Sequence, residues 1–222
     1  MNLNNKILIT GVSGYIGSCL YNYLKKNNKF VYGLDKIKPT KLSLVKKRDF
    51  FLCNLLNQKK LRKILFLVKP TVIIHLAAQS TVDPAISFKK YFIDNVKTTE
   101  NLISVIKELK ISKIVFSSTA AVYKEKDSSL TEEDNVKSKS NYGKSKILAE
   151  NLIRKNKKLK FIILRFFNVS SSLTEPFVGE HHFPETHFIP TLVFRSLKNQ
   201  TTKVFGRNYN TDDGTCIRDY IH

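Results

Sequence analysis

The sequence has no tryptophan, one methionine and only three cysteines among its 222 residues. Cys19, Cys53 and Cys216 are far apart and form no CxxC pair, which argues against a disulfide framework or a zinc module and suits a reduced, cytosolic compartment. No run approaches the roughly 18 consecutive apolar residues of a membrane-spanning helix. The first ten residues do not have the pattern of a signal peptide. The sequence therefore indicates a cytoplasmic protein without a membrane segment.

Acidic residues are also scarce. The chain has 18 Asp and Glu against 38 Lys and Arg, for a formal net charge of +20. Such a charge is typical of polyanion-binding proteins, but 31 of the basic residues are lysines and only seven are arginines. Nucleic-acid readers favour arginine, because its planar guanidinium makes paired hydrogen bonds to bases and phosphates. We interpret the excess as scattered, solvated lysines and expect no specific nucleic-acid partner.

Apolar residues make up 42% of the chain, enough to bury a core, and they occur in two alternating patterns. Short, β-branched and almost continuously apolar runs are typical of buried parallel strands, and longer segments with helical spacing lie between them. The expected strands are residues 6–10, 30–34, 50–53, 72–76, 113–117 and 161–165. The expected helices are residues 15–26, 58–69, 85–110 and 142–157. This alternation predicts an α/β fold with a Rossmann-like, doubly wound parallel sheet.

The composition changes after about residue 167, where Ser, Thr, Pro, Gly and His accumulate and the periodicity fades. We expect this tail to form long loops, with one helix at about residues 188–199 and one strand at about residues 202–205. The sequence thus divides into residues 1–167, which contain the predicted sheet, and residues 168–222.

The motif GVSGYIG follows the first predicted strand directly and opens the first predicted helix. Gly11 allows a tight turn, Gly14 lets the backbone approach a pyrophosphate, and Gly17 permits close packing of helix against strand. Asp35 ends the second strand, where a carboxylate accepts hydrogen bonds from an adenosine ribose and repels a 2′-phosphate. The pattern predicts binding of NAD in preference to NADP, although the neighbouring Lys36 is able to neutralise such a phosphate.

The motif YGKSK opens a later helix and places Tyr142 and Lys146 one turn apart on the same helix face. Tyrosine is a poor base at its ordinary pKa of about 10, but a neighbouring cation favours the phenolate. The hydroxyls of Ser117, Ser118 and Thr119 lie at the end of the preceding strand, and strand ends are where α/β sheets bind ligands. We expect Tyr142 and Lys146 to be catalytic beside these hydroxyls, with the lysine favouring the phenolate.

Further motifs follow in a fixed order: HLAA, FSSTAAVY, LRFFN and, at the C-terminus, DGTCIRDYIH. Together with the glycine loop and YGKSK, they resemble the extended short-chain dehydrogenase/reductase family, the NAD-dependent epimerases and dehydratases. The likeness is greatest to the UDP-glucose 4-epimerase branch, above all in residues 179–190 and 204–222. The resemblance covers residues 6–222.

The resemblance implies a catalytic set of Tyr142, Lys146 and Thr119 and a reaction for it. Tyr142 would take the proton from the sugar 4-hydroxyl as hydride leaves C4 for NAD. Lys146 would hydrogen-bond the nicotinamide ribose and depress the pKa of the phenol. Thr119 would bridge the 4-oxygen to the tyrosine. The 4-keto sugar would then rotate within the site, and the hydride would return to the opposite face of the sugar. UDP-glucose and UDP-galactose would interconvert in this way, with NAD regenerated in the site.

The resemblance also implies two sets of binding residues. The set around NAD comprises Gly11, Gly14, Tyr15, Ile16, Gly17, Asp35, Asn54, Leu55, Leu76, Ala77, Ala78, Ser80, Asn95, Tyr142, Lys146 and Phe167. The set around the UDP-sugar comprises Thr119, Asn168, His187, Phe205 and Arg218, the last suited to the diphosphate. Two positions depart from the family pattern, because Asn54 replaces an Asp that accepts from the adenine amino group and Ser80 replaces a Lys. We expect weaker adenine binding rather than its loss, since an amide carbonyl still accepts.

Other interpretations fit less well. Sugar-nucleotide dehydratases and decarboxylases need further acid–base residues directly after the position of Thr119, where this chain has Ala120 and Ala121. The histidines of residues 181–187 have no standard metal-ligand spacing, so we expect no metal. A lysine-rich, non-catalytic protein would leave the Tyr142 motif unexplained.

Members of the family continue for a substantial further segment beyond the last motif of this chain. The resemblance therefore implies a complete NAD-binding domain in residues 1–167 and a partial, C-terminally truncated substrate domain in residues 168–222. A gene fragment, a split gene and another UDP-sugar pair stay open as alternatives, and so does a homodimer. For this chain alone we expect NAD binding with little or no 4-epimerase activity.

Overall fold

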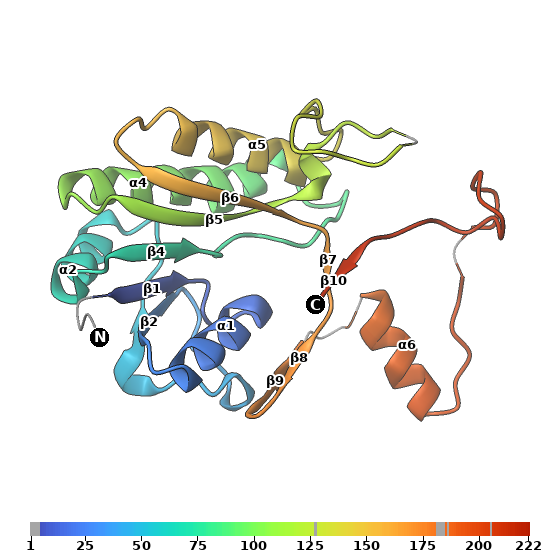
Figure 1. The fold of residues 1–222 in the computed structure, drawn as a ribbon, viewed down its shortest axis with the longest axis horizontal. Coiled ribbons are helices and arrows are strands. Elements are labelled where there is room, and N and C mark those ends of the chain that lie inside the picture. The colour runs from blue at the N-terminus through green and yellow to red at the C-terminus, as the bar shows by residue number, and fades with distance from the viewer. Residues whose placement is uncertain (1–4, 127, 181–184, 186, 205) are drawn as a thin grey trace.

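The computed structural model describes residues 5–126, 128–180, 185, 187–204 and 206–222. A six-stranded parallel sheet with the order β3-β2-β1-β4-β5-β6 lies at its centre (Figure 1). The strands are β1 (Lys6–Thr10), β2 (Phe30–Asp35), β3 (Phe50–Leu52), β4 (Val72–His75), β5 (Lys113–Thr119) and β6 (Lys160–Phe166). The strand order reverses between β1 and β4, and the crevice above such a switch is where α/β sheets bind ligands. The predicted Rossmann-like, doubly wound sheet is confirmed.

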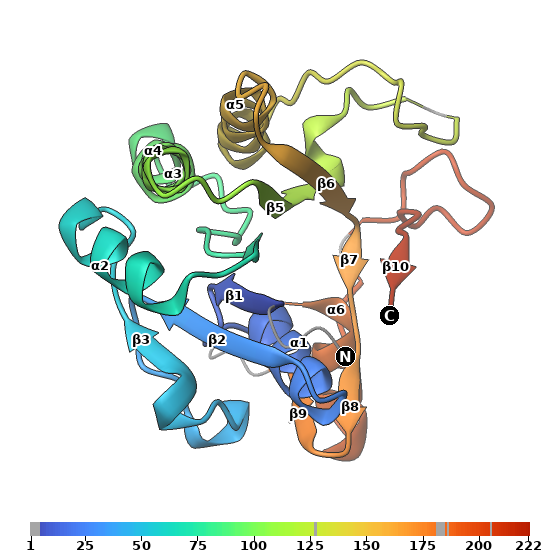
Figure 2. The ribbon, with the colours of Figure 1, turned by 60° about the vertical axis from the view of Figure 1, so that its left-hand side comes forward.

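Helices cover both faces of the sheet unequally (Figures 1 and 2). On one face lie α2, α4 and α5, and on the other lies α1, against β1 and β2. The predicted helix over residues 85–110 is divided, because a π-helical segment, Phe92–Lys97, separates a short helix from a longer one. The helices of the sheet region are α1 (Tyr15–Lys26), α2 (Gln58–Val68), α3 (Phe88–Tyr91), α4 (Thr98–Glu108) and α5 (Asn141–Arg154).

The larger core cluster lies beneath α2, α4 and α5. It includes Leu61 of α2, Leu102 of α4 and Ile114 of β5, none of which is more than 2% exposed. Burial of each such side chain contributes roughly 1.5–3 kcal/mol. Alternate residues of a strand point to opposite faces, and on the face of α1 the β6 residues Ile162 and Leu164 are 57% and 38% exposed. The sheet is therefore well packed on one face and partly uncovered on the other.

The tail contains more short strands than the sequence predicts. Strand β7 (Asn168–Val169) pairs in parallel with β10 (Tyr220–Ile221), and β8 (Ser172–Thr174) forms a hairpin with β9 (Phe177–Gly179). The expected strand at residues 202–205 is wrong for residues 202–204, which have no strand pairing, and Phe205 lies outside the described residues. Strands of two or three residues are too short to show a periodicity of two, so the sequence gives no signal for them.

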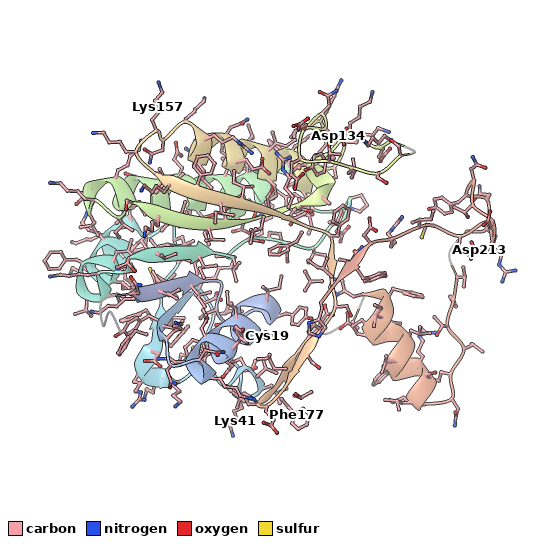
Figure 3. All side chains as sticks on the ribbon, viewed as in Figure 1. Cys19, Lys41, Asp134, Lys157, Phe177 and Asp213 are labelled. Atoms are coloured by element: carbon pink, nitrogen blue, oxygen red, sulfur yellow. The ribbon has the colours of Figure 1, made fainter. Side chains whose placement is uncertain are left out.

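The tail has few buried side chains. The expected tail helix is present as α6 (Phe188–Leu197), but none of its residues is buried. Figure 3 shows Phe177 at the end of the β8–β9 hairpin and Asp213 in the outlying loop before β10. Phe177 is 83% exposed, whereas Val178 beside it is buried. The tail thus touches the sheet region mainly through its first segments.

Those first segments are held by α1. The Tyr15 hydroxyl accepts a hydrogen bond from Ser171 N at 2.6 Å and donates one to Ser171 O at 2.5 Å. The Cys19 thiol lies 3.4 Å from the carbonyl oxygen of Val178. The helix that begins at the glycine loop therefore also anchors the tail. Among the described residues, no helix combines the length and apolarity needed to cross a bilayer.

Candidate active site

The glycine loop joins β1 to α1 at the carboxyl edge of the sheet. Gly11 has a φ of +76°, and a Cβ there would lie 2.6 Å from the backbone nitrogen of Ala77 in the loop after β4. A Cβ at Gly17 would lie 2.2 Å from the carbonyl oxygen of Gly11. A Cβ at Gly14 would meet that oxygen only at 3.4 Å, so the fold does not need a glycine there. Helix α1 starts without a side-chain cap, which leaves its first N–H groups for an anion.

Asp35 ends β2 beside this loop and is 9% exposed. Its carboxylate accepts hydrogen bonds from Ser13 N at 3.0 Å and from Ile37 N at 3.3 Å. Each oxygen has further acceptor capacity, so the group can still receive ribose hydroxyls. Asn54 and Leu55 follow β3 at the same edge, and the Asn54 carbonyl accepts from Leu56 N at 2.9 Å within its own turn.

Asn95 holds the loop after β4. Its carbonyl accepts from Gln79 N at 2.7 Å, and its amide nitrogen donates to Gln79 O at 3.2 Å and to Ser145 Oγ at 2.9 Å. The residue is 2% exposed. The side-chain bonds of Asn95 thus lie within the protein, and they fix the backbone that carries the predicted cofactor residues Leu76, Ala77, Ala78 and Ser80.

A second buried chain of hydrogen bonds fixes the same loop from β4. The Thr99 hydroxyl donates to Asn95 O at 2.6 Å, so it accepts from His75 Nε2–H at 3.0 Å. His75 Nδ1 then accepts from the Thr10 hydroxyl at 2.7 Å, and that oxygen accepts from Ala77 N at 3.3 Å. The donors and acceptors match only for a neutral imidazole with its proton on Nε2. Burial, and secondarily the charge of Lys146, lowers the pKa of His75 to about 3.

Acid should therefore unfold the protein partly through His75. Its pKa falls from an ordinary 6.5 to about 3 in the folded chain, so its stability contribution is full above pH 6.5 and is lost as the pH falls toward 3. The loss is at most about 5 kcal/mol, at about 1.4 kcal/mol per pKa unit. Urea unfolding over this range should give a shallower pH dependence for His75→Gln than for the parent. His222→Gln, which changes an exposed histidine, should keep the parental slope, and equal slopes for all three proteins would contradict the prediction.

The Tyr142 and Lys146 side chains lie together on the buried face of α5. Tyr142 is 8% exposed and Lys146 is 2% exposed. The Lys146 ammonium lies 4.6 Å from the centre of the Phe116 ring, and the Tyr142 ring lies 5.9 Å from that of Tyr91. Thr119, at the end of β5, lies close enough to the Tyr142 phenol to lower its pKa, and its hydroxyl accepts from Ala121 N at 3.1 Å. The structure thus brings the predicted catalytic residues to the same strand end.

The expected effect of Lys146 on the tyrosine is wrong for this structure. Burial raises the pKa of Tyr142 to about 12, and the hydrogen bond from Thr119 only partly offsets it. Burial also lowers the pKa of Lys146 to about 7, although the Glu150 carboxylate acts in the opposite direction. Lys146 is not among the groups that shift the pKa of Tyr142, so burial dominates the state of the phenol. Desolvation by the surrounding apolar groups was not visible in the spacing of the motif.

The sequence analysis missed a buried ion pair next to these residues. Glu150 lies one helical turn beyond Lys146 and accepts from Ser118 Oγ at 2.5 Å. It also accepts from Arg165 of β6, from Nε at 3.1 Å and from the second guanidinium nitrogen at 2.8 Å. The sequence did contain a signal for Glu150, because it lies eight residues after Tyr142 on the same helix face. Glu150 thereby joins α5 to the ends of β5 and β6.

The residues implied for the UDP-sugar are less closely gathered. Asn168 begins β7, directly after Phe167 of the predicted NAD set, and its side-chain amide donates to Asp219 O at 2.9 Å. Arg218 is exposed and donates to Ile217 O at 2.7 Å. The remaining two, His187 and Phe205, are at the start of α6 and outside the described residues, respectively. Among the described residues of this set, Asn168, His187 and Arg218 are exposed.

His187 contacts two carboxylates. Its Nδ1 lies 2.7 Å from Glu180 Oε1 and 3.1 Å from Glu185 Oε1. The ligand atoms of the three residues lie within 4.8 Å of one another, as in a metal site, but ion pairs of this kind need no metal. The other two histidines considered as ligands, His181 and His182, lie outside the described residues.

The glycine loop lies at the switch point of the sheet, and the buried Tyr142–Lys146 pair lies beside β5. Together these features define a nucleotide-binding α/β enzyme. Comparisons with known proteins agree with this class. The NAD dependent epimerase/dehydratase family model matches residues 7–222. The chain belongs to this family.

Relatives and solved structures are similar over nearly the whole chain. The UDP-glucose 4-epimerase of Mycoplasma genitalium is 38% identical over 98% of this chain and 67% of its own length, and that of Rhizobium meliloti is 37% identical over 99% and 69%. The crystal structure of UDP-glucose 4-epimerase from Brucella ovis in complex with NAD superposes with a TM-score of 0.90 at 29% identity, over 98% of this chain and 69% of that one. The chain thus spans about two-thirds of the length of these relatives.

Proposed function

We propose that this protein binds NAD and interconverts UDP-glucose and UDP-galactose by 4-epimerisation. The observation that carries the proposal is the meeting of Thr119, Tyr142 and Lys146 at the end of β5, at the same sheet edge as the glycine loop. The relatives described above are UDP-glucose 4-epimerases, and one of the superposed structures, from Bifidobacterium longum, is a complex with NAD+ and UDP.

The residues at this edge are suited to hold the dinucleotide. The glycine loop and the first turn of α1 would bind its pyrophosphate, and Asp35 would bind the adenosine ribose. Asn95 acts indirectly, because it orients the backbone after β4. NAD bound in this way supplies the acceptor for the hydride from C4 and a positively charged ring that favours the phenolate.

The Tyr142 phenol would exchange the proton of the sugar 4-hydroxyl. Tyr142 is neutral at pH 7, so it must lose its proton before it can accept one from the sugar 4-hydroxyl. Lys146 has a pKa of about 7, so the free energy needed for it to gain or lose a proton near neutral pH is small. Thr119 would hold the 4-oxygen against the phenol. The two residues directly after Thr119 are Ala120 and Ala121, neither of which can transfer a proton, and this favours epimerisation over elimination or decarboxylation.

Tyr142→Phe should lower the conversion of UDP-galactose to UDP-glucose by at least ~10², because it removes the proton-exchanging group. Nucleotide released from the denatured protein should show that NAD content is unchanged. Thr119→Ala should cost less, and Thr119→Ser, which keeps the hydroxyl, should be nearly silent. Near-parental turnover by Tyr142→Phe would refute the site assignment.

A second candidate function is NAD binding without turnover by the isolated chain. It is favoured by the open arrangement of the sugar-side residues, since Asn168 and Arg218 are exposed and α6 buries none of its side chains. A loosely held substrate loses rate steeply, with about 1 Å of displacement costing about 10². Purified protein that contains NAD but does not convert UDP-galactose would favour this candidate over the first.

We also propose a homodimer in a reducing, cytosolic compartment. A groove between the π-helical segment and α5 has an apolar floor to which the helices of a second copy could pack, with polar residues at its sides. The apolar lining residues are Phe92, Val96, Leu148 and Leu152, and the polar ones are Lys97, Glu100, Asn151 and Lys155. The three cysteines are free thiols, as a reducing compartment requires. Sedimentation of the protein with and without reductant tests both points.

A further inference from the structure

An ion pair connects two walls of the crevice at the carboxyl edge of the sheet. Lys36 directly follows Asp35 at the end of β2, and its ammonium lies 3.4 Å from Asp94 Oδ1. Asp94 lies in the π-helical segment, next to Asn95, which holds the loop after β4. Strands β2 and β4 lie on either side of β1. The Lys36–Asp94 pair therefore links the segments that follow the two neighbours of the glycine-loop strand.

The partners differ in their exposure. The Asp94 side chain is 11% exposed and the Lys36 side chain 51%. The second oxygen of Asp94 lies 2.7 Å from the Lys90 ammonium. Asp94 is thus the fixed member, held by α3 and the π-helical segment, and Lys36 is a flexible cation drawn toward it.

The position of Lys36 matters for the choice of cofactor. A dinucleotide ribose that binds Asp35 would bring its 2′ substituent close to the next residue of the chain. A 2′-phosphate carries up to about two negative charges and is stabilised by a nearby cation. Lys36 is the cation next to Asp35 in the chain, yet its charge is directed to Asp94. The formal charges of Asp35, Lys36, Lys90 and Asp94 add up to zero. These four side chains together therefore give a 2′-phosphate no net attraction.

We propose that Asp94 is a specificity-determining residue that favours NAD over NADP by holding Lys36 away from the 2′ position. The inference deepens the proposed function, because it rests on dinucleotide binding at this edge. Asp35 alone disfavours a 2′-phosphate by repulsion, but it cannot prevent Lys36 from neutralising that phosphate. By pairing with Lys36, Asp94 prevents this neutralisation. The negative charge of Asp94 itself also repels a phosphate bound beside Asp35.

The test is titration of the purified protein, freed of bound nucleotide, with NADH and with NADPH, followed by nicotinamide fluorescence. The parent should bind NADH more tightly than NADPH. Asp94→Asn should improve NADPH affinity about tenfold, the gain expected for one charge-assisted hydrogen bond, and leave NADH within about twofold. Retained NADH binding shows at the same time that the variant is folded. Asp94→Ser serves in the same way if the asparagine variant does not fold.

Two controls separate the ion pair from net charge. Glu100→Gln changes the charge of the chain equally, but Glu100 pairs with Lys97 and not with Lys36. It should leave both affinities unchanged. Lys36→Gln combined with Asp94→Asn should lose the gain for NADPH.

Each contrary outcome has a defined meaning. An unchanged NADPH affinity in Asp94→Asn would overturn the inference, and so would a gain that persists without Lys36 or that Glu100→Gln reproduces. A parent that binds neither nucleotide would instead refute the proposed function itself.

Discussion

Glu150→Gln is expected to lower the free energy of unfolding by about 3 kcal/mol, because it leaves the largely buried Arg165 guanidinium without its counter-charge. Burial raises the pKa of Glu150, but hydrogen bonds from Arg165 and Ser118 outweigh it, so the pKa stays below its ordinary range. The carboxylate therefore stabilises the fold above its ordinary pKa of 4.5, and this contribution is lost as the pH falls toward the folded value. Urea unfolding at neutral pH measures the effect.

An exposed ion pair provides the matched control. Glu108 is about half exposed and lies 2.7 Å from Arg62, so Glu108→Gln should cost less than about 1 kcal/mol. The difference between the Glu150 variant and the parent should also shrink in acid, where the parental carboxylate becomes protonated. A Glu150→Gln protein no less stable than Glu108→Gln would show that Glu150 does not join α5 to the sheet energetically.

Gly17→Ala is expected to abolish detectable NADH binding and to destabilise the fold by about 3 kcal/mol. The added Cβ would lie 2.2 Å from Gly11 O and 2.8 Å from the Val12 Cα, and neither backbone atom can rotate away. Helix α1 must then move from β1, which displaces the N–H groups that would receive the pyrophosphate. Fluorescence titration with NADH and thermal unfolding measure the two effects.

Gly14→Ala should separate binding from stability. Its Cβ would contact only Gly11 O, at 3.4 Å, so the melting temperature should change little. A methyl group at this position would still obstruct a pyrophosphate, and NADH should bind about tenfold more weakly or worse. Equal losses of stability in the two variants would contradict the distinct roles that we assign to these glycines.

The sheet was predictable because its strands are short, apolar and separated by helices with clear periodicity. Five of its strands begin and end within one residue or so of the predicted positions, from Lys6–Thr10 to Lys160–Phe166. The tail was not predictable in the same way. Its pairing partners, such as β7 and β10, are about fifty residues apart and are two residues long, so only tertiary contacts define them.

Part of the site was predictable for a related reason. The glycine loop and Asp35 have fixed spacings that place them at strand ends, and the spacing of the Tyr142 motif places its two side chains on one face of α5. Charges and hydrogen bonds between distant segments have no such spacing. The deprotonating environment of Lys146, the neutral state of His75 and the pairing of Lys36 with Asp94 all depend on contacts across the fold.

The double hydrogen bond between Tyr15 and Ser171 has a consequence for how ligands communicate. Tyr15 is the first residue of the helix that begins at the glycine loop, and Ser171 follows the strand that contains Asn168. Under the proposed function, a nucleotide that fixes the first turn of this helix would also restrain the segment proposed to bind the sugar. By reciprocity, a UDP-sugar that orders this segment would strengthen nucleotide binding by the same factor. Through the Tyr15 phenol, the two proposed binding regions would then be thermodynamically coupled.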